Sequence, residues 1–278
     1  MSVRLCDGDL AFYREHGYLL AKGLIPDPQV LALLQGIDRL LCTQGSGLVP
    51  SDASHVSEDI HAKIMQLKVL DRKALGTVYD AIRKLMPFWS ILSGPPLTSA
   101  VEQLLGTEAV GLAFRGCGIR LDIPGEDEWR SRLHQEYHSQ MSSLRGVVAW
   151  FGLAAVSHDM GPVRVLDGSH GAGLLPVRCL DPMNAAGNYT GTFVLAEEDA
   201  LAAKYPPVTV ETEPGDVLFL DFLTVHESGF NRSPGRSRIT CQVRYFDMME
   251  ETSIRHCWKG GWQEGGDFTK LHPDKVVP

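Results

Sequence analysis

Hydrophobic and polar positions follow two different periods along this chain. From Asp9 to about Leu41, apolar residues recur every three or four positions in the segments DLAFYREHGYLL and DPQVLALLQGIDRLL. This spacing predicts two amphipathic helices, because it gathers the apolar side chains on one helical face. Residues 42–58 are rich in glycine, serine and aspartate and predict a loop. Helical spacing returns in IHAKIMQLKVLD, in residues 73–92 and in LTSAVEQLLG.

From about Ala109 onward the period changes. β-branched and aromatic residues gather in short runs separated by glycine, proline and aspartate: VGLAFRGCGIRLDI, LRGVVAWFGLAAV, PVRVLDG, TGTFVL, PVTVETE, DVLFLDF and RSRITCQVRYFDM. Runs of this kind predict strands. A helical first part followed by seven or eight short strands favours a mainly β fold, a jelly-roll core with a helical buttress, over an alternating α/β sheet.

Composition indicates one domain. The chain has 278 residues, 44% of them hydrophobic, and it contains no internal repeat or low-complexity tract. That length suffices for one large core. We expect a single domain over residues 1–278, with a helical part at about 9–106, a jelly-roll core at about 109–248 and a C-terminal extension at 249–278.

Net charge, the N-terminal segment and the cysteine pattern limit the partners and the cellular location that we expect. The formal net charge is −8 and basic residues are scattered among acidic ones, so no nucleic-acid-binding stripe is present. The first 20 residues lack an apolar run long enough for a signal peptide or a membrane span. Six cysteines form no C-x-x-C pair, which indicates reduced thiols. We expect a cytoplasmic protein that acts on a small molecule, without nucleic acid or membrane as a partner; its oligomeric state stays open.

The stretch RLHQEYHSQ raises the question of a metal site. His134 and Glu136 are two positions apart, so on a strand they would share a face and could bind one ion. His226 follows the apolar segment GDVLFLDFLTV, and rigid packing at the end of a buried strand suits a ligand. Two histidines and one carboxylate leave three open positions on an octahedral ion, as in non-haem Fe(II) oxygenases. The alternative is a solvated H-x-E pair. His138 would share the face, and we expect it to support the ligands from behind or to contact the substrate rather than to bind the metal.

A second group of polar residues lies in RSRITCQVRYF. Strand alternation places Arg238, Thr240, Gln242 and Arg244 on one face, with Ile239, Cys241, Val243 and Tyr245 on the other. If the polar face points inward, a guanidinium and a hydroxyl lie side by side and can bind a carboxylate. This pattern predicts a site for an anionic cosubstrate, although Arg238 could instead form a surface salt bridge.

These motifs resemble the phytanoyl-CoA dioxygenase family of Fe(II)/2-oxoglutarate oxygenases. The similar segments are HQE at 134–136, DMGPVRVLDGSHGAG at 159–173, PGDVLFLDFLTVHESGFNRSPGRSRITCQVRYF at 214–246 and the opening FYREHGYLLAKGLIPDPQV. They occur in the family's order and span roughly residues 9–248. The resemblance implies a double-stranded β-helix, a cupin-like variant of the jelly roll.

The resemblance also implies the ligands of each cofactor. Fe(II) would be bound by His134, Glu136 and His226, and 2-oxoglutarate would bind iron and place its far carboxylate on Arg238 and Thr240. Arg120 occupies a place where family members often have a basic residue near the cosubstrate or substrate. The chain departs from the family's pattern at Glu136, where the usual metal ligand is aspartate.

The function implied by the resemblance is a dioxygenase that uses O2. We expect it to hydroxylate a C–H bond of a small polar, possibly anionic molecule with release of succinate and CO2. Residues 179–205 suggest a lid over the site, with Tyr189, like His138, as a candidate substrate contact. Two other classes stay open: a non-catalytic metal-binding jelly roll, such as a sensor or carbohydrate-binding module, and a cupin-like Mn or Zn isomerase or hydrolase.

Overall fold

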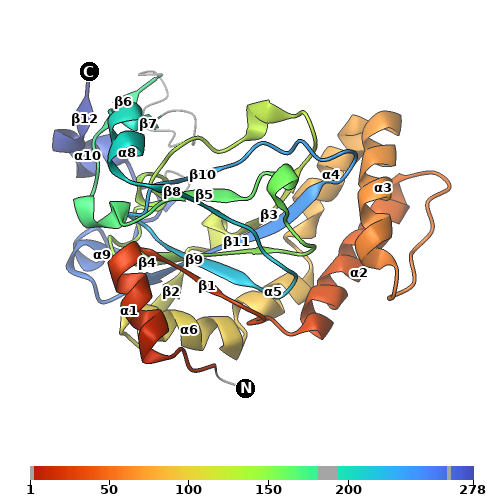
Figure 1. The fold of residues 1–278 in the computed structure, drawn as a ribbon, viewed down its shortest axis with the longest axis horizontal. Helices are drawn as coiled ribbons and strands as arrows, with labels where there is room; N and C mark the ends of the chain where they lie inside the picture. The colour runs from red at the N-terminus through yellow and green to blue at the C-terminus, as the bar shows by residue number, and fades with distance from the viewer. Residues whose placement is uncertain (1–2, 181–192, 262–263) are drawn as a thin grey trace.

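Helices occupy most of the first 105 residues. The computed structural model describes residues 3–180, 193–261 and 264–278. Its α-helices are α1 (Asp7–His16), α2 (Asp27–Gln44), α3 (Val56–Leu70), α4 (Arg72–Ile82), α5 (Met86–Leu92), α6 (Pro95–Leu105), α7 (Tyr137–Gln140), α8 (Glu198–Lys204), α9 (Glu251–Arg255) and α10 (Phe268–Leu271). Figure 1 shows α2, α3 and α4 together at one end of the molecule and α5 and α6 beneath the strands.

Local chemistry sets the ends of several helices. The Asp71 side chain accepts from the Ala74 amide at 2.9 Å and caps α4. The segment 73–92, predicted as one helical stretch, forms α4 and α5 instead. Pro87 in the first turn of α5 explains the break, because proline cannot supply the amide that an unbroken helix needs.

The first predicted helix was too long. The pattern DLAFYREHGYLL predicted one helix, but α1 ends at His16 and Tyr18–Ala21 forms the strand β1. Gly17, at φ 76°, ends the helix in the left-handed conformation that glycine adopts without strain. β1 then pairs antiparallel with β9 (Val217–Asp221), so long-range pairing overrides the local helical pattern.

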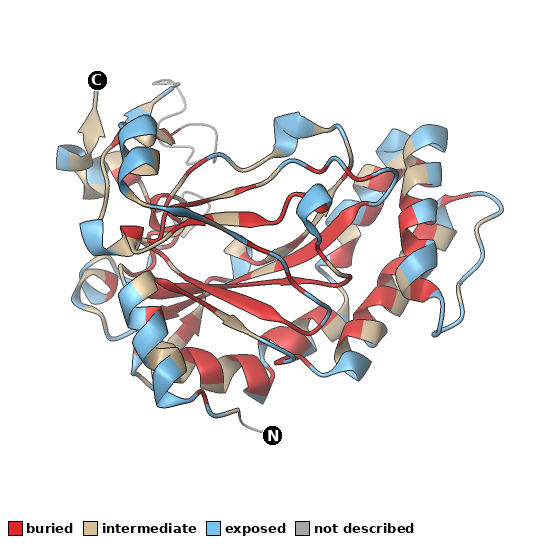
Figure 2. Cartoon of the chain, viewed as in Figure 1, coloured by how far each residue is buried: buried red, intermediate tan, exposed pale blue. Residues whose placement is uncertain are grey.

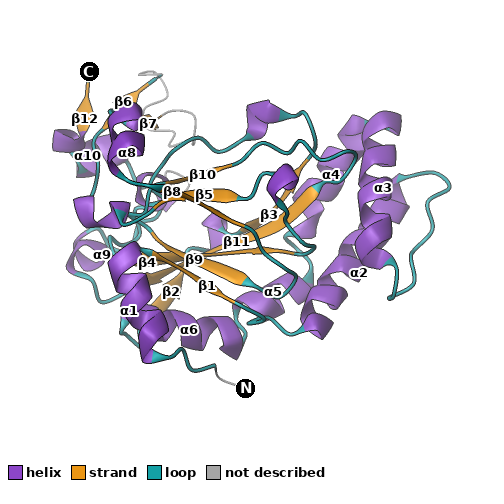
Figure 3. Cartoon of the chain, viewed as in Figure 1, coloured by secondary structure: helices purple, strands orange, loops and turns teal. Residues whose placement is uncertain are grey.

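The strands of the described residues, drawn in orange in Figure 3, form three sheets in which most neighbouring strands are antiparallel. The largest has the order β1-β9-β4-β11-β2, with β3 also paired to β11. The second has the order β10-β5-β8, and the third has the order β12-β6-β7. The remaining bounds are β2 (Val110–Leu112), β3 (Gly118–Asp122), β4 (Gly146–Gly152), β5 (Val163–Leu166), β6 (Val177–Cys179), β7 (Phe193–Leu195), β8 (Pro207–Val210), β10 (His226–Ser228), β11 (Arg238–Asp247) and β12 (Val276–Val277). The mainly β, jelly-roll core with a helical buttress is confirmed.

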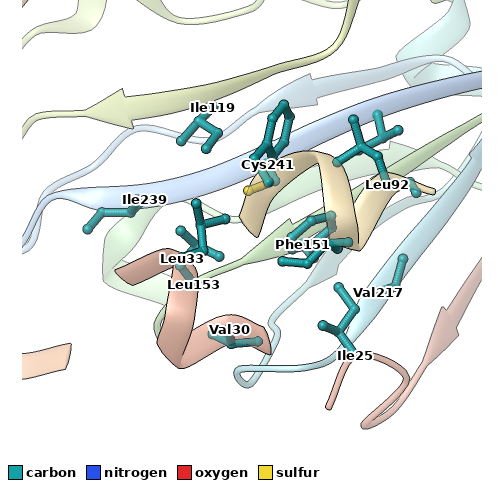
Figure 4. Packing of buried hydrophobic residues seen from close by; sticks show 14 of the residues in the cluster. Ile25, Val30, Leu33, Leu92, Ile119, Phe151, Leu153, Val217, Ile239 and Cys241 are labelled. Atoms are coloured by element: carbon teal, nitrogen blue, oxygen red, sulfur yellow. The ribbon is translucent and has the colours of Figure 1, made fainter. Parts of the chain in front are cut away.

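Alternation along β11 separates an apolar face from a polar one. Ile239 and Cys241 belong to the core formed with the helices, where Figure 4 shows them near Leu33 of α2 and Phe151 of β4. The side chains that alternate with these two along β11 point to the opposite face of the sheet, as the sequence predicted. On that opposite face, Val148 of β4 belongs to a second cluster that also contains Val163 of β5. The large sheet therefore has helices on one face and the small sheets on the other.

Burial follows this arrangement. Figure 2 shows buried residues along the strands of the large sheet and on the inward sides of the helices. The buried face of β11 that looks away from the helices carries Arg238 and Thr240, exposed by 2% and 0%. Charged groups at such depth need partners, since an unpaired buried charge is costly. Among the described residues, no helix is both long and apolar enough to cross a membrane.

Candidate metal centre

Two histidines from distant parts of the chain face each other across a short antiparallel bridge. The His134 amide donates to the His226 carbonyl, and the His226 amide donates to the His134 carbonyl, both at 3.1 Å. His226 begins β10, and His134 lies in the segment before α7. Their ring centroids are 4.3 Å apart. Backbone pairing therefore brings together two imidazoles that are far apart in the sequence. The local spacing of residues does not predict this contact.

Each imidazole is oriented by its own hydrogen bond. His134 Nδ1 donates to the Arg132 carbonyl at 2.7 Å, and His226 Nδ1 donates to the Thr224 carbonyl at 2.9 Å. A carbonyl only accepts, so the proton sits on Nδ1 and the Nε2 lone pair is left free. Metal-binding histidines commonly donate their other ring N–H in this way. Both rings thus have the tautomer that a metal requires.

Glu136 completes the group, but not on a strand. It adopts helical backbone angles, φ −62° and ψ −33°, at the boundary of α7. The expected strand geometry for His134-x-Glu136 is therefore wrong, because the chain turns into α7 directly after the bridge. One ligand atom each from His134, Glu136 and His226 still lie within 4.8 Å of one another. A bridge followed by a helical turn achieves the convergence that strand alternation predicted.

Burial and charge set the protonation states of this group. Burial, with the nearby His134, lowers the pKa of His226 to about 3. Burial opposes ionisation of Glu136, yet Arg244 and the two imidazoles outweigh it and lower the pKa of that carboxyl to about 2. A neutral imidazole, as at His226, and an ionised carboxylate, as at Glu136, are the forms that bind a divalent metal. The donor set fits Fe(II) in a site of two histidines and one carboxylate.

The predicted cosubstrate residues lie on adjoining strands. Arg238 and Thr240 on β11 pair with Asp122 and Arg120 on β3, respectively. The Arg238 guanidinium lies 3.0 Å from the Asp122 carboxylate, and that of Arg120 lies 2.7 Å from it. The buried Thr240 hydroxyl has no hydrogen-bond partner among the described residues. An unpaired hydroxyl next to the buried Arg238 and the half-buried Arg120 is a fitting place for a carboxylate.

A cavity of about 100 Å³ opens beside the three candidate ligands. Arg120 is in its wall, but Arg238 is not; Arg238 instead borders a much smaller space with Asp122 and Phe230. Further residues line the larger cavity: Ser131, Val148, Trp150, Val163, Leu220, Glu227, Ser228, Gln242 and Arg244. Strand alternation placed Gln242 and Arg244 on the inward face without a role. Ser228 was not among the predicted site residues, although its position two residues after His226 on β10 was an available signal.

The two candidate substrate contacts lie apart from this cavity or outside the described chain. His138 is buried in α7, where its Nε2 donates to the Leu175 carbonyl at 3.0 Å and its ring packs edge-on against Phe268 at 5.0 Å. Burial lowers the pKa of His138 to about 4. His138 is not among the residues lining the cavity. Tyr189, with residues 181–192 of the predicted lid, lies outside the described residues.

Comparison with known proteins identifies the family. The phytanoyl-CoA dioxygenase (PhyH) family model matches residues 13–240. This chain belongs to that family. It is similar to a probable phytanoyl-CoA dioxygenase of Caenorhabditis elegans, with 23% identity over 248 residues that cover 87% of this chain and 76% of the relative. The family resemblance inferred from the motifs is confirmed.

Solved structures support the fold of this PhyH-family chain. The epimerase SnoN, in complex with Fe3+, alpha ketoglutarate and nogalamycin RO, is similar with a TM-score of 0.60 and 20% identity, over 90% of this chain and 88% of SnoN. EctD from S. alaskensis, with 2-oxoglutarate and 5-hydroxyectoine, has a TM-score of 0.52 and 18% identity, over 88% of this chain and 77% of EctD. At these identities the likeness concerns the fold.

Family membership decides among the function classes that the sequence left open. The chain is an Fe(II)/2-oxoglutarate-dependent dioxygenase, with Fe(II) as its metal and 2-oxoglutarate and O2 as cosubstrates. The sensor, carbohydrate-binding and Mn or Zn isomerase or hydrolase alternatives are set aside. The His-Glu-His group supplies the donors such an enzyme needs.

Proposed function

We propose that this dioxygenase hydroxylates a C–H bond of a small polar molecule and converts 2-oxoglutarate and O2 into succinate and CO2. The observation that carries the proposal is the convergence of His134, Glu136 and His226 within 4.8 Å at the wall of a cavity. Fe(II) bound by these three residues would supply the redox chemistry with O2. The protein's own contribution is to orient the ligands, bind the cosubstrate and exclude bulk water.

The cosubstrate's far carboxylate would be bound by Arg238 and Thr240. Arg238 already donates to Asp122, but a guanidinium has five N–H donors and can serve two carboxylates. The Thr240 hydroxyl, unpaired among the described residues, would gain a partner. Arg120, in the cavity wall, would stay paired with Asp122 and contribute positive potential beside the cosubstrate.

The cavity wall supports a polar substrate without strong net charge. Trp150 and Val148 form an apolar side, while Ser131 and Gln242 offer neutral polar groups. Among the described residues, the arginines and glutamates of the wall number two each. Each arginine is paired with a carboxylate: Arg120 with Asp122 and Arg244 with Glu136. A wall of balanced charge favours orientation by hydrogen bonds over capture of an anion.

Anaerobic titration of the purified protein with Fe(II) and 2-oxoglutarate tests the proposal. A weak visible charge-transfer band on addition of both, followed by succinate when O2 is admitted, is the expected result. Bound iron without a band would overturn the assignment of the cosubstrate site. Mass analysis of products from a panel of neutral and anionic polar molecules then tests hydroxylation directly, since an added oxygen atom distinguishes it from epimerisation or ring closure.

A further inference from the structure

The candidate metal carboxylate is held by an arginine through both oxygens. Arg244 Nε donates to Glu136 Oε1 at 2.8 Å, and Arg244 Nη2 donates to Glu136 Oε2 at 3.3 Å. The Ser139 hydroxyl also donates to Oε1 at 3.1 Å. Oε1 therefore has two close donors, whereas Oε2 has one longer bond and lies 4.0 Å from His134 Nε2. The two oxygens differ in their surroundings.

Arg244 is itself fixed by groups other than Glu136. Its Nη1 donates to the Gly116 carbonyl, and its Nη2 donates to Gln242 Oε1 at 2.9 Å. The backbone of Arg244 lies in the middle of the large sheet, opposite Val148 of β4. Only 13% of the side chain is exposed. These contacts fix the guanidinium independently of Glu136. Its planar arrangement of N–H donors suits a carboxylate with two oxygens.

The contact with Arg244 limits a conformational freedom that a glutamate ligand has and an aspartate ligand lacks. Glutamate has one more rotatable bond than aspartate, so its carboxylate can swing and can offer both oxygens to a metal. A second oxygen would occupy one of the three positions that a two-histidine, one-carboxylate site must keep open. Holding Oε1 away from the histidines leaves Oε2 as the available donor.

We propose that Arg244 is a positioning residue that presents Oε2 of Glu136 as a single-oxygen metal ligand. This inference rests on the proposed function, because it assumes that His134, Glu136 and His226 bind the metal. Outer partners of ligating carboxylates typically contribute 10- to 100-fold in metal affinity. Arg244 differs from the ligands in that its effect must pass through Glu136.

A double-mutant cycle with Mn(II) tests the coupling without turnover. Wild type, Arg244→Gln, Glu136→Gln and the double variant are titrated with Mn(II) by calorimetry and electron paramagnetic resonance, in the absence of O2. We expect Arg244→Gln to weaken Mn(II) binding about 10- to 100-fold. The double variant should bind as weakly as Glu136→Gln alone, because an arginine that acts only through Glu136 has nothing left to position.

Two matched variants separate positioning from folding. Arg244→Lys keeps the charge but loses the fork, so it should fold and still bind Mn(II) more weakly than wild type. Arg255→Gln removes an exposed arginine that pairs with Glu251 and should leave affinity unchanged. Circular dichroism checks that each variant is folded.

Each outcome has a distinct meaning. Wild-type affinity in Arg244→Lys or Arg244→Gln would overturn the positioning role, as would losses that multiply in the double variant. Failure of wild type itself to bind Mn(II) would instead overturn the proposed metal site. The two failures are therefore distinguishable in one set of titrations.

Discussion

The Arg238 guanidinium lies 3.0 Å from the Asp122 carboxylate, although 116 positions separate the two residues in the chain. Pairing of β11 with β3 places them directly opposite each other. Burial opposes ionisation of Asp122, but Arg238 and Arg120 outweigh it and lower its pKa. Asp122 is therefore a charged anchor that orients Arg238 at the edge of the site.

Replacing Arg238 should weaken 2-oxoglutarate far more than metal. For Arg238→Gln we expect about 10- to 100-fold weaker 2-oxoglutarate binding, because charge-assisted hydrogen bonds are worth about 1.5–3 kcal/mol. Mn(II) binding should change little, since Arg238 is outside the ligand group. Calorimetry with each ligand measures both. Arg232→Gln, an exposed arginine six residues earlier, serves as control. Equal losses for both ligands would show that Arg238 does not bind the cosubstrate.

Removing one histidine should abolish metal-dependent stabilisation. In wild type, Mn(II) at about 100 times its Kd should add about 2.7 kcal/mol to the free energy of unfolding and raise Tm by several degrees. His226→Ala removes one of three donors, so its Tm should not respond to Mn(II). His55→Ala, outside the site, should respond like wild type. Differential scanning calorimetry with and without chelator gives the comparison; a full Tm shift in His226→Ala would exclude this residue as a ligand.

Asp221 should make stability fall as pH rises. Burial raises its pKa to about 6, opposed by the Leu223 amide and by His170 and Arg145. A carboxyl with a raised folded-state pKa favours folding below its unfolded value near 3.8, and this contribution is lost as pH rises through about 6. The loss is about 1–3 kcal/mol.

Asp221→Asn isolates this effect. The variant should be more stable than wild type at pH 7.5, and the difference should shrink toward pH 4, because the amide does not ionise while its oxygen can still accept from Leu223. Burial and Asp221 raise the pKa of the buried Tyr13 hydroxyl, which has no hydrogen-bond partner among the described residues. Urea unfolding at both pH values measures the difference. A constant difference would argue that Asp221 does not titrate in this range.

The segment after β11 should contribute to stability through Phe268. This ring is fully buried and packs against His138, Phe193 and His272. His272 in turn lies 2.8 Å from the Tyr137 hydroxyl of α7. Truncating a buried phenylalanine to alanine costs about 3–5 kcal/mol, so Phe268→Ala should lower Tm clearly. A change in Tm under about 2 °C would mean that the C-terminal segment is not packed on α7 in solution.

Local periodicity accounts for the parts of the fold that the sequence predicted. The inward and outward faces of β11 follow from alternation, since Ile239 and Cys241 are apolar and Arg238 and Thr240 are not. The same reasoning failed for Tyr18–Ala21, whose apolar residues continued a helical pattern but pair with β9. A short apolar run does not indicate whether a distant strand will pair with it instead of leaving it in a helix.

The sequence by itself determined the residue types of the site and the two-residue spacing of His134 and Glu136, because motifs are properties of the chain. Only the tertiary structure decided that the two histidines pair through backbone bonds, that Glu136 lies at a helical turn, and that Arg244 holds its carboxylate. These contacts join positions about 90 to 110 residues apart. Sheet register and packing bring them together, and neither is encoded in nearest-neighbour spacing.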